Sequence, residues 1–251
     1  MNNQANTAKI EAFSATPCPQ ENKLSCPSLD CKIDSSHLVC LVGPHRSQLR
    51  SYLHMLAGIT KPGQGKVEIF GRAVSELSHA DWRKLRSQIG YLSGTSPLLS
   101  VQHGLMNVML PLLYHGNLSF RETADKARVL LDELQCDFDP IKFPAFLNSF
   151  QRSQLALARA LILDPTVLYL DLPFHDLGAK HREKMGELLA KHKLGRAVCM
   201  VGGLQYTHFL ELHANQIIFI SEHKIITFNS WDSFIHSEYH DVKHLLSLVQ
   251  S

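Results

Sequence analysis

Three apolar runs separated by helical segments constrain the fold of this chain most strongly. They are HLVCLVG at residues 37–43, TVLYLDLP at 166–173 and RAVCMVGG at 196–203. Runs that are apolar at nearly every position are typical of parallel strands covered on both faces. Parallel strands are joined by crossover connections, which are usually helices. We therefore predict an α/β fold with a mostly parallel sheet and helices on both of its faces.

The other segments predict what accompanies this sheet. Short strands near residues 9–13 and 28–33 indicate an N-terminal antiparallel β portion, and residues 216–228 read as a hairpin. From about residue 96 to 150 the pattern is helical, with a capping box formed by Ser119 and Glu122. We expect a single domain, 1–251, divided into an α/β core (8–95 and 153–228), an inserted helical subdomain (96–152) and a C-terminal helical tail (229–251).

Charge and hydropathy exclude several classes of protein. The net charge is +2, from 25 basic and 23 acidic side chains, which gives no general attraction to nucleic acid or anionic lipid. No run of about 18 apolar residues is present, so we expect no transmembrane helix. The first fifteen residues lack the charged start and apolar block of a signal peptide. We therefore expect a cytosolic protein without a nucleic-acid partner.

Cysteine and histidine are the residues to test for metal binding. The six cysteines are scattered without a CxxC pair, which in a reducing compartment favours free thiols, several of them buried, over a disulfide or metal site. His236, His240 and His244 recur every four residues and would share one face of a single helix. That face could hold a metal or simply contact solvent; the apolar residues opposite favour solvent, and we expect no metal.

The segment LVCLVGPHRSQLRSYLHMLAGITKP, residues 38–62, has the layout of a phosphate-binding loop. An apolar strand leads through a Gly-Pro turn into an amphipathic helix. Further blocks follow in order: HMLAGITKPGQGKVEIFG, then IGY, then ALARALILDPTVLYLDLP. Together they resemble the ATP-binding subunit of ABC transporters over some 200 residues. The resemblance implies a P-loop NTPase-like fold and ATP as the family's cofactor.

The phosphate loop of that family reads GxxGxGK[ST], and this chain departs from it at most of its positions. Gly43 matches the first glycine, but Arg46 and Gln48 replace the next two, Leu49 replaces the lysine and Arg50 replaces the magnesium-binding hydroxyl. Side chains therefore occupy the space that phosphates need. A leucine cannot stabilise the charge of a transferring phosphoryl group.

The other positions that carry the family's chemistry are altered as well. Asp171 matches the aspartate at the end of the Walker B strand and is its vestige here. The replacements are Leu172 for the catalytic glutamate, Gly94 for the Q-loop glutamine, Phe150 within LNSFQ in place of LSGGQ, Gly178 for the D-loop aspartate and Gly203 for the switch histidine. We expect Phe150 to project into the nucleotide gap. With no catalytic residue left, we interpret the chain as a degenerate ATPase that requires no cofactor.

The resemblance also implies partners. In the family each ATP lies between two subunits, so a homodimer or a heterodimer is expected, and a transmembrane permease docks beside the helical subdomain. The corresponding groove residues are Gly94, Leu98, Leu105 and Val108, although packing within the subdomain core would equally explain the apolar ones. The chain would then lie at the inner face of the membrane through its permease. The segment LMNVMLPL resembles lipid- and lipoprotein-handling branches, and LPF resembles phospholipid-trafficking (lipid-asymmetry maintenance, Mce-associated) ATPases.

Two alternative functions stay open. Gly43, His45, Arg46 and Arg50, with Asp171, could form a vestigial nucleotide loop that binds ATP, another nucleotide or phosphate weakly at a helix N-terminus, where the helix dipole favours anions. The chain would then be a regulator without hydrolysis, unless the arginines only contact solvent or nearby acids. An ABC ATPase with residual binding and hydrolysis is the other alternative.

Overall fold

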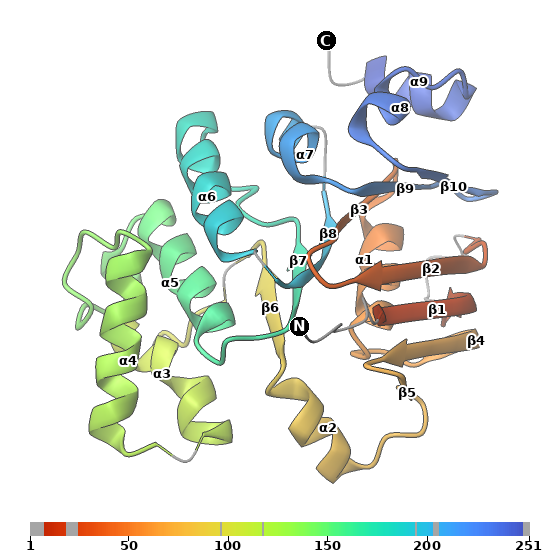
Figure 1. Cartoon of the computed structure of the whole chain (residues 1–251). Helices are drawn as coiled ribbons and strands as arrows, with labels where there is room; N and C mark the ends of the chain where they lie inside the picture. Colours follow the sequence, from red (N-terminus) through yellow and green to blue (C-terminus); the bar gives the residue numbers. More distant parts are fainter. Residues whose placement is uncertain are drawn as a thin grey trace, which may run out of the picture. The chain divides into compact units, whose positions relative to one another are not determined.

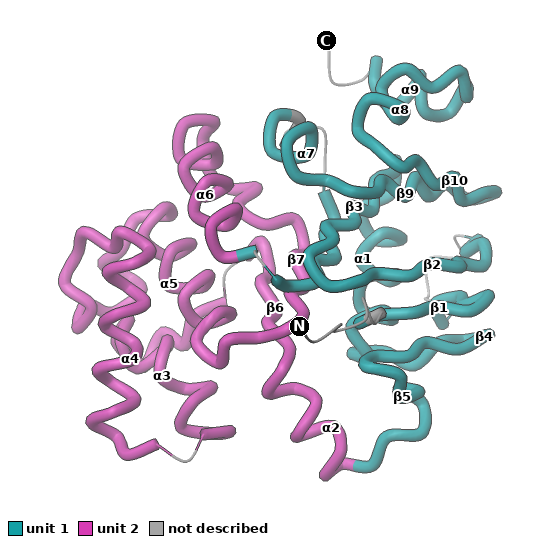
Figure 2. Tube along the Cα trace, viewed as in Figure 1, with its two compact units in different colours: residues 1–78, 193–251 teal, residues 79–192 magenta. Residues whose placement is uncertain are grey.

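The computed structural model describes residues 8–18, 25–95, 97–116, 118–193, 195–202 and 206–247. The chain forms two compact units, residues 1–78 with 193–251 (unit 1) and residues 79–192 (unit 2), shown in different colours in Figure 2. The boundaries expected from sequence differ from these: the helical segment 96–152 lies within unit 2, together with strands and helices of the expected core. Among the described residues, no helix is long and apolar enough to span a membrane.

Unit 1 contains an antiparallel sheet near the N-terminus, as predicted. Its order is β2-β1-β4-β5, and its strands are β1 (Ala8–Pro17), β2 (Leu29–Asp34), β4 (Pro62–Ile69) and β5 (Arg72–Ala73). Strand β1 pairs with β2 and β4, and each of these pairings carries an irregularity after Ala12 or Phe13. At this point Ser14 has a φ of 44°, and its backbone N–H donates to Asp30 Oδ1 at 2.7 Å.

The parallel part of unit 1 is built around β3 (Leu38–Val42), in which every residue is buried. It pairs in parallel with β8 (Ala197–Val201) and with β9 (Gln216–Ile220). Strand β10 (Ile225–Phe228) pairs antiparallel with β9, which confirms the predicted hairpin. Helix α1 (Arg46–Leu56) contacts β1 and β4 of the first sheet as well as β3 and β8, and it buries Tyr52 and Leu53 completely.

The C-terminal part of unit 1 contains α7 (Thr207–His213), α8 (Trp231–Ile235) and α9 (His240–Ser247) (Figure 1). The three histidines do not share one helix, because the chain leaves α8 at His236 and begins α9 at His240. In the turn between them, the N–H of Tyr239 donates to Ser237 Oγ at 3.2 Å, and the Tyr239 ring packs against Phe228. The described residues contain no group of three or more metal-binding side chains.

Unit 2 combines a parallel strand pair with helices. Strands β6 (Ile89–Ser93) and β7 (Val167–Asp171) run parallel. The helices are α2 (His79–Arg86), α3 (Gly104–His115), α4 (Phe120–Glu133), α5 (Ser149–Leu161) and α6 (Ala179–His192), with a short 3-10 turn, η1 (Pro144–Phe146). Helices α3, α4 and α5 pack on one another. The predicted capping box of Ser119 and Glu122 is confirmed at the start of α4.

The six cysteines are free thiols. Cys40 and Cys199 are buried in adjacent parallel strands, as the sequence suggested for several of the six. Burial raises the pKa of the Cys40 thiol to about 12 and the pKa of Cys199 well above its usual value. Both side chains therefore stay protonated and act as small apolar residues of the core.

Candidate functional site: a rebuilt phosphate loop

The loop between β3 and α1 lies in unit 1 and begins at Gly43. A Cβ atom on Gly43 would overlap the carbonyl oxygen of Ile220, at the end of the neighbouring strand β9. The glycine is therefore required by close backbone packing in this chain. Helix α1 begins at Arg46; its N-cap residue is His45, whose side chain caps no helical N–H.

Gln48 holds the loop to two other segments of unit 1. Its side chain is buried at 2% exposure, and its Nε2 donates to the carbonyl oxygens of Ser25 at 2.7 Å and Ser221 at 3.3 Å. Ser25 precedes β2 and Ser221 follows β9. A glycine at this position in the family leaves room for phosphate, whereas here an amide side chain occupies it and binds protein carbonyls.

This contact makes a first prediction. Replacing Gln48 by alanine removes both hydrogen bonds, of which the one to Ser221 is buried and the one to Ser25 half-buried, so the free energy of unfolding should fall by about 1–2 kcal/mol, measured by urea denaturation. Arg46→Ala on the exposed side of the same helical turn is the matched control and should change it by less than about 0.5 kcal/mol. Equal effects of the two substitutions would contradict the role given to Gln48.

Leu49 and Ser51 also face inward in this loop. Leu49 stands where the family has lysine, but its side chain is 1% exposed and belongs to the core of unit 1. Ser51 is 5% exposed, and its hydroxyl donates to the carbonyl oxygen of Ser47 at 2.9 Å, inside the helix. Both side chains are thus engaged within the protein, Leu49 in the core and Ser51 by the helix backbone.

The charged residues of the loop do not replace these groups. His45 Nε2 lies 3.2 Å from Glu222 Oε1, so a carboxylate stands beside the start of α1. Arg46 and Arg50 are exposed. Because Gln48 and Leu49 are buried at two positions of the loop motif and the Glu222 carboxylate flanks the start of α1, these residues do not fit a magnesium-bound nucleotide in the manner of the family.

The Walker B strand and the segment after it lie in unit 2. Asp171 ends β7 at 3% exposure, and the hydroxyl of Tyr91 donates to its Oδ2 at 3.4 Å. The next residue, Leu172, is buried in place of the catalytic glutamate with a φ of 48°, and Phe174 is buried with a φ of 61°. A residue other than glycine in this left-handed backbone conformation costs of order 1–3 kcal/mol, so the surrounding packing must hold the backbone of both residues in it.

Gly94 shows why the Q-loop glutamine is absent. Its N–H donates to the carbonyl oxygen of Asp171 at 2.7 Å. A Cβ atom on Gly94 would overlap the carbonyl oxygen of Leu172 and lie 2.6 Å from Nδ1 of His175. The imidazole of His175 is held on its other side by Asp176, with Nε2 and Oδ1 2.8 Å apart. The backbone after β7 and this imidazole therefore leave no room for a glutamine.

The segment corresponding to the signature motif lies at the start of α5, where Asn148 and Gln151 form a reciprocal capping box. Asn148 Oδ1 accepts from the N–H of Gln151 at 2.9 Å, and Gln151 Oε1 accepts from the N–H of Asn148 at 3.1 Å. Phe150 stacks on His181 with ring centroids 4.6 Å apart, and Lys184 Nζ lies 5.7 Å from the Phe150 centroid. Within unit 2 the Phe150 ring is thus engaged by α6, an anchor that the sequence did not suggest.

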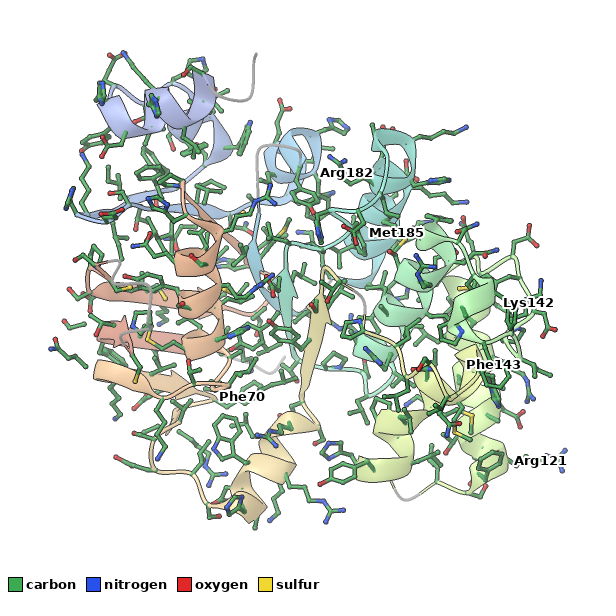
Figure 3. All side chains as sticks on the ribbon, turned by 180° about the vertical axis from the view of Figure 1, so that it is seen from behind. Phe70, Arg121, Lys142, Phe143, Arg182 and Met185 are labelled. Carbon is green, nitrogen blue, oxygen red and sulfur yellow. The ribbon has the colours of Figure 1, made fainter. Side chains whose placement is uncertain are left out.

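The predicted groove residues differ in their exposure. Leu105 is 6% exposed and Val108 0%, so both pack in the helical core, the alternative that the sequence left open. Leu98 is half-buried, whereas the nearby Leu99 and Val101 are 48% and 78% exposed. Gly178 is exposed just before α6, where Arg182 (labelled in Figure 3) donates from Nη2 to the carbonyl oxygen of Leu177 at 2.7 Å. Gly203 lies outside the described residues.

Comparison with known proteins agrees with this architecture. The profile of the ABC transporter family matches residues 27–175. The chain belongs to the ABC transporter family. A LolD ATP-binding protein of a lipoprotein-releasing system, from Hydrogenovibrio crunogenus, is 30% identical over 199 residues, 78% of this chain and 85% of that protein. An uncharacterised ABC transporter ATP-binding protein of Thermotoga maritima is 32% identical over 176 residues, 69% and 73% of the two chains. LolD 1 of Chlorobium chlorochromatii is 28% identical over 163 residues, which are 64% of this chain. The matched region spans 66% of that relative, just under two thirds of its length.

Solved structures show the same fold. One of them is a dimeric ATP-binding cassette in a post-hydrolysis state, bound to ADP and phosphate, with a TM-score of 0.75 at 23% identity. The superposition covers 86% of this chain and 97% of that cassette. The cbiO1 protein of Clostridium perfringens, part of the ABC transporter complex cbiONQ, has a TM-score of 0.76 at 17% identity. The superposition covers 96% of this chain and 95% of cbiO1. The predicted P-loop NTPase-like α/β fold is thereby confirmed.

Proposed function

We propose that this ABC-family subunit does not hydrolyse ATP and acts as a structural or regulatory component of a membrane transport complex. The observation that carries the proposal is the interior of the phosphate loop, where Leu49 is packed in the core and Gln48 binds two protein carbonyls. Loss of a single charge-stabilising group typically lowers an enzymatic rate by about two to three orders of magnitude. Here Leu172 and Gly94 replace two further groups of that machinery.

The proposed partner is a transmembrane permease at the inner face of the membrane, with a second ABC-type subunit completing a homodimer or heterodimer. The exposed Leu99 and Val101, close to the predicted groove, support a docking surface there better than the buried Leu105 and Val108. The names of the LolD relatives and the LMNVMLPL segment support a lipidated cargo, a lipoprotein or a phospholipid.

An ATPase assay tests this proposal. Purified full-length protein with magnesium and ATP should release phosphate no faster than its Asp171→Asn variant, because a buried leucine stands where the family has the lysine that stabilises the transferring phosphoryl group. Comparison with this variant separates activity of the chain from that of a contaminant, which the substitution would leave unchanged. Robust turnover that disappears in Asp171→Asn would overturn the proposal and establish an ABC ATPase with an altered site.

A second candidate function is a nucleotide- or phosphate-binding regulator. It is favoured by Arg46 and Arg50, which are exposed in the first two turns of α1 with no acidic residue in the first turn. It is disfavoured by Glu222, whose carboxylate pairs with His45 at the same helix end. A thermal shift caused by ATP, ADP or phosphate and lost in an Arg46→Ala, Arg50→Ala double variant would support the regulator; no shift would remove it.

A further inference from the structure

An exposed surface of unit 2 combines four cations with large apolar side chains. It is formed by α2, the C-terminal end of α3 and the first turn of α4, and we call it the α2–α3–α4 surface. Figure 1 shows these elements along the lower edge of the view, and Figure 3 labels Arg121. Its cations are the exposed Arg83, Lys84, Arg86 and Arg121. Its apolar members are Leu113, Tyr114, Leu118 and Phe120, which are 40%, 64%, 43% and 60% exposed.

Contacts join α2 to the C-terminal end of α3 on this surface. Arg83 Nη2 donates to the carbonyl oxygen of Tyr114 at 3.2 Å, and the guanidinium carbon of Arg83 lies 5.1 Å from the Tyr114 ring centroid. Arg86 lies over the ring of Trp82 at 5.4 Å, on the same helix. The aromatic rings thus hold two of the cations in place while leaving them exposed, which cation–π contacts do at little cost.

Cations outnumber acids on this surface: the four basic side chains lie on the same elements as Asp81 of α2 and Glu122 of α4. None of the described ion pairs involves any of the four cations. Glu122, beside Arg121, accepts hydrogen bonds from the hydroxyl and N–H of Ser119, which lower the pKa of its carboxyl group, so one negative charge stays next to Arg121. The pKa of His115 is lowered, first by burial and then by the positive charges of Arg83 and Arg86. The net charge of +2, averaged over the whole chain, conceals this local excess.

We propose that the α2–α3–α4 surface binds the headgroup layer of an anionic phospholipid membrane. Arginine and lysine near such a surface are attracted by its phosphate groups, and tyrosine and tryptophan favour the boundary between water and hydrocarbon. Exposed leucine and phenylalanine side chains beside them can enter that boundary, as they do in interfacial helices. An acidic protein segment would use the cations but has no need of four exposed apolar side chains. The proposal rests on this surface alone and does not depend on the absence of ATP hydrolysis.

Vesicle flotation of the full-length protein tests the proposal. Vesicles of phosphatidylcholine with an equal part of phosphatidylglycerol should retain the protein, and vesicles of phosphatidylcholine alone should retain much less. A Lys84→Glu, Arg121→Glu double variant should lower the partition coefficient on anionic vesicles at least about thirtyfold, because each cation near the membrane contributes about a fivefold factor and at least two such factors are lost. Phe120→Ser should lower it without changing the charge.

The matched control carries the same charge change on another face of unit 2. Lys180 and Lys191 are exposed on α6, and a Lys180→Glu, Lys191→Glu variant should bind within a few fold of the unmodified protein. Circular dichroism and thermal midpoints verify that all variants fold. Absence of binding to anionic vesicles, or equal losses in the two double variants, would overturn the proposal. Binding of a glutamate-rich peptide with no vesicle binding would assign the surface to an acidic protein partner instead.

Discussion

Replacing Leu49 by lysine should destabilise the protein by about 3 kcal/mol and should not create ATP hydrolysis. The substitution restores the residue that the family uses to contact phosphate, but it does so at a core position that is 1% exposed. The new ammonium group would have to leave water or force the loop open, and the packing of the leucine would be lost. Urea denaturation measures the first effect and phosphate release the second.

The control for this experiment is Leu49→Met, which keeps an apolar side chain of similar volume. It should lower the free energy of unfolding by less than about 1.5 kcal/mol. If Leu49→Lys were as stable as Leu49→Met, the lysine would have found a route to solvent, and the loop would be closer to a working phosphate site than its packing indicates. A gain of ATP turnover in Leu49→Lys would lead to the same conclusion.

Replacing Gly94 by alanine should have a comparable effect in unit 2, a loss of about 3 kcal/mol. The added Cβ would overlap the carbonyl oxygen of Leu172, lie 2.6 Å from Nδ1 of His175 and lie 3.0 Å from the carbonyl oxygen of Asp171. Two of these three atoms belong to the backbone and cannot rotate away. Glutamine, the residue of the family, should be at least as destabilising.

Gly178→Ala provides the matched control in the same unit. A Cβ at Gly178 meets no atom within 4 Å, and the backbone there is not in the left-handed region. The substitution should therefore be neutral or stabilise the protein by up to about 1 kcal/mol through the unfolded chain. Thermal and urea unfolding of the two variants should differ clearly; equal stability would show that the segment after β7 can move away from Gly94.

The predictions for Leu49 and Gly94 rest on the same kind of packing, in unit 1 and in unit 2 respectively. In each, the residue at a position that we align with a nucleotide-contacting residue of the family is enclosed by other protein atoms. Gln48 and Leu49 do this in the loop of unit 1, and His175 with the backbone of Leu172 does it beside Gly94. Reversal by a single substitution is therefore expected to disturb packing before it restores chemistry.

Much of the fold could be predicted from the sequence because its signals are local. Continuous apolar runs marked β3, β7 and β8, and the spacing of apolar residues marked α1. The hairpin of β9 and β10 and the capping box of Ser119 depend on residues close together in the chain. The loss of each nucleotide-contacting residue could also be read position by position, because the family motif is a linear pattern.

What the sequence did not indicate depends on residues that are distant along the chain. The three histidines are divided between the end of α8 and α9, where Tyr239 packs on Phe228 and the chain turns at Ser237. From the sequence, Leu105 and Val108 could have lined a groove or packed in a core. The packing of α3, α4 and α5 on one another buries both of them in the core. The anchoring of Phe150 on His181 likewise joins two helices that the motif does not connect.

The sequence by itself indicated the family and the order of strands and helices, and it predicts that Leu49 and Leu172 stand in place of the lysine and the catalytic glutamate. Tertiary structure alone decided what the replacements do. Gln48 reaches carbonyl groups that are 23 and 173 positions away in the chain, and Gly94 is required by backbone atoms beyond the end of β7. A side chain's identity is a local property, whereas its burial and its hydrogen-bond partners are set by segments that meet only when the chain folds.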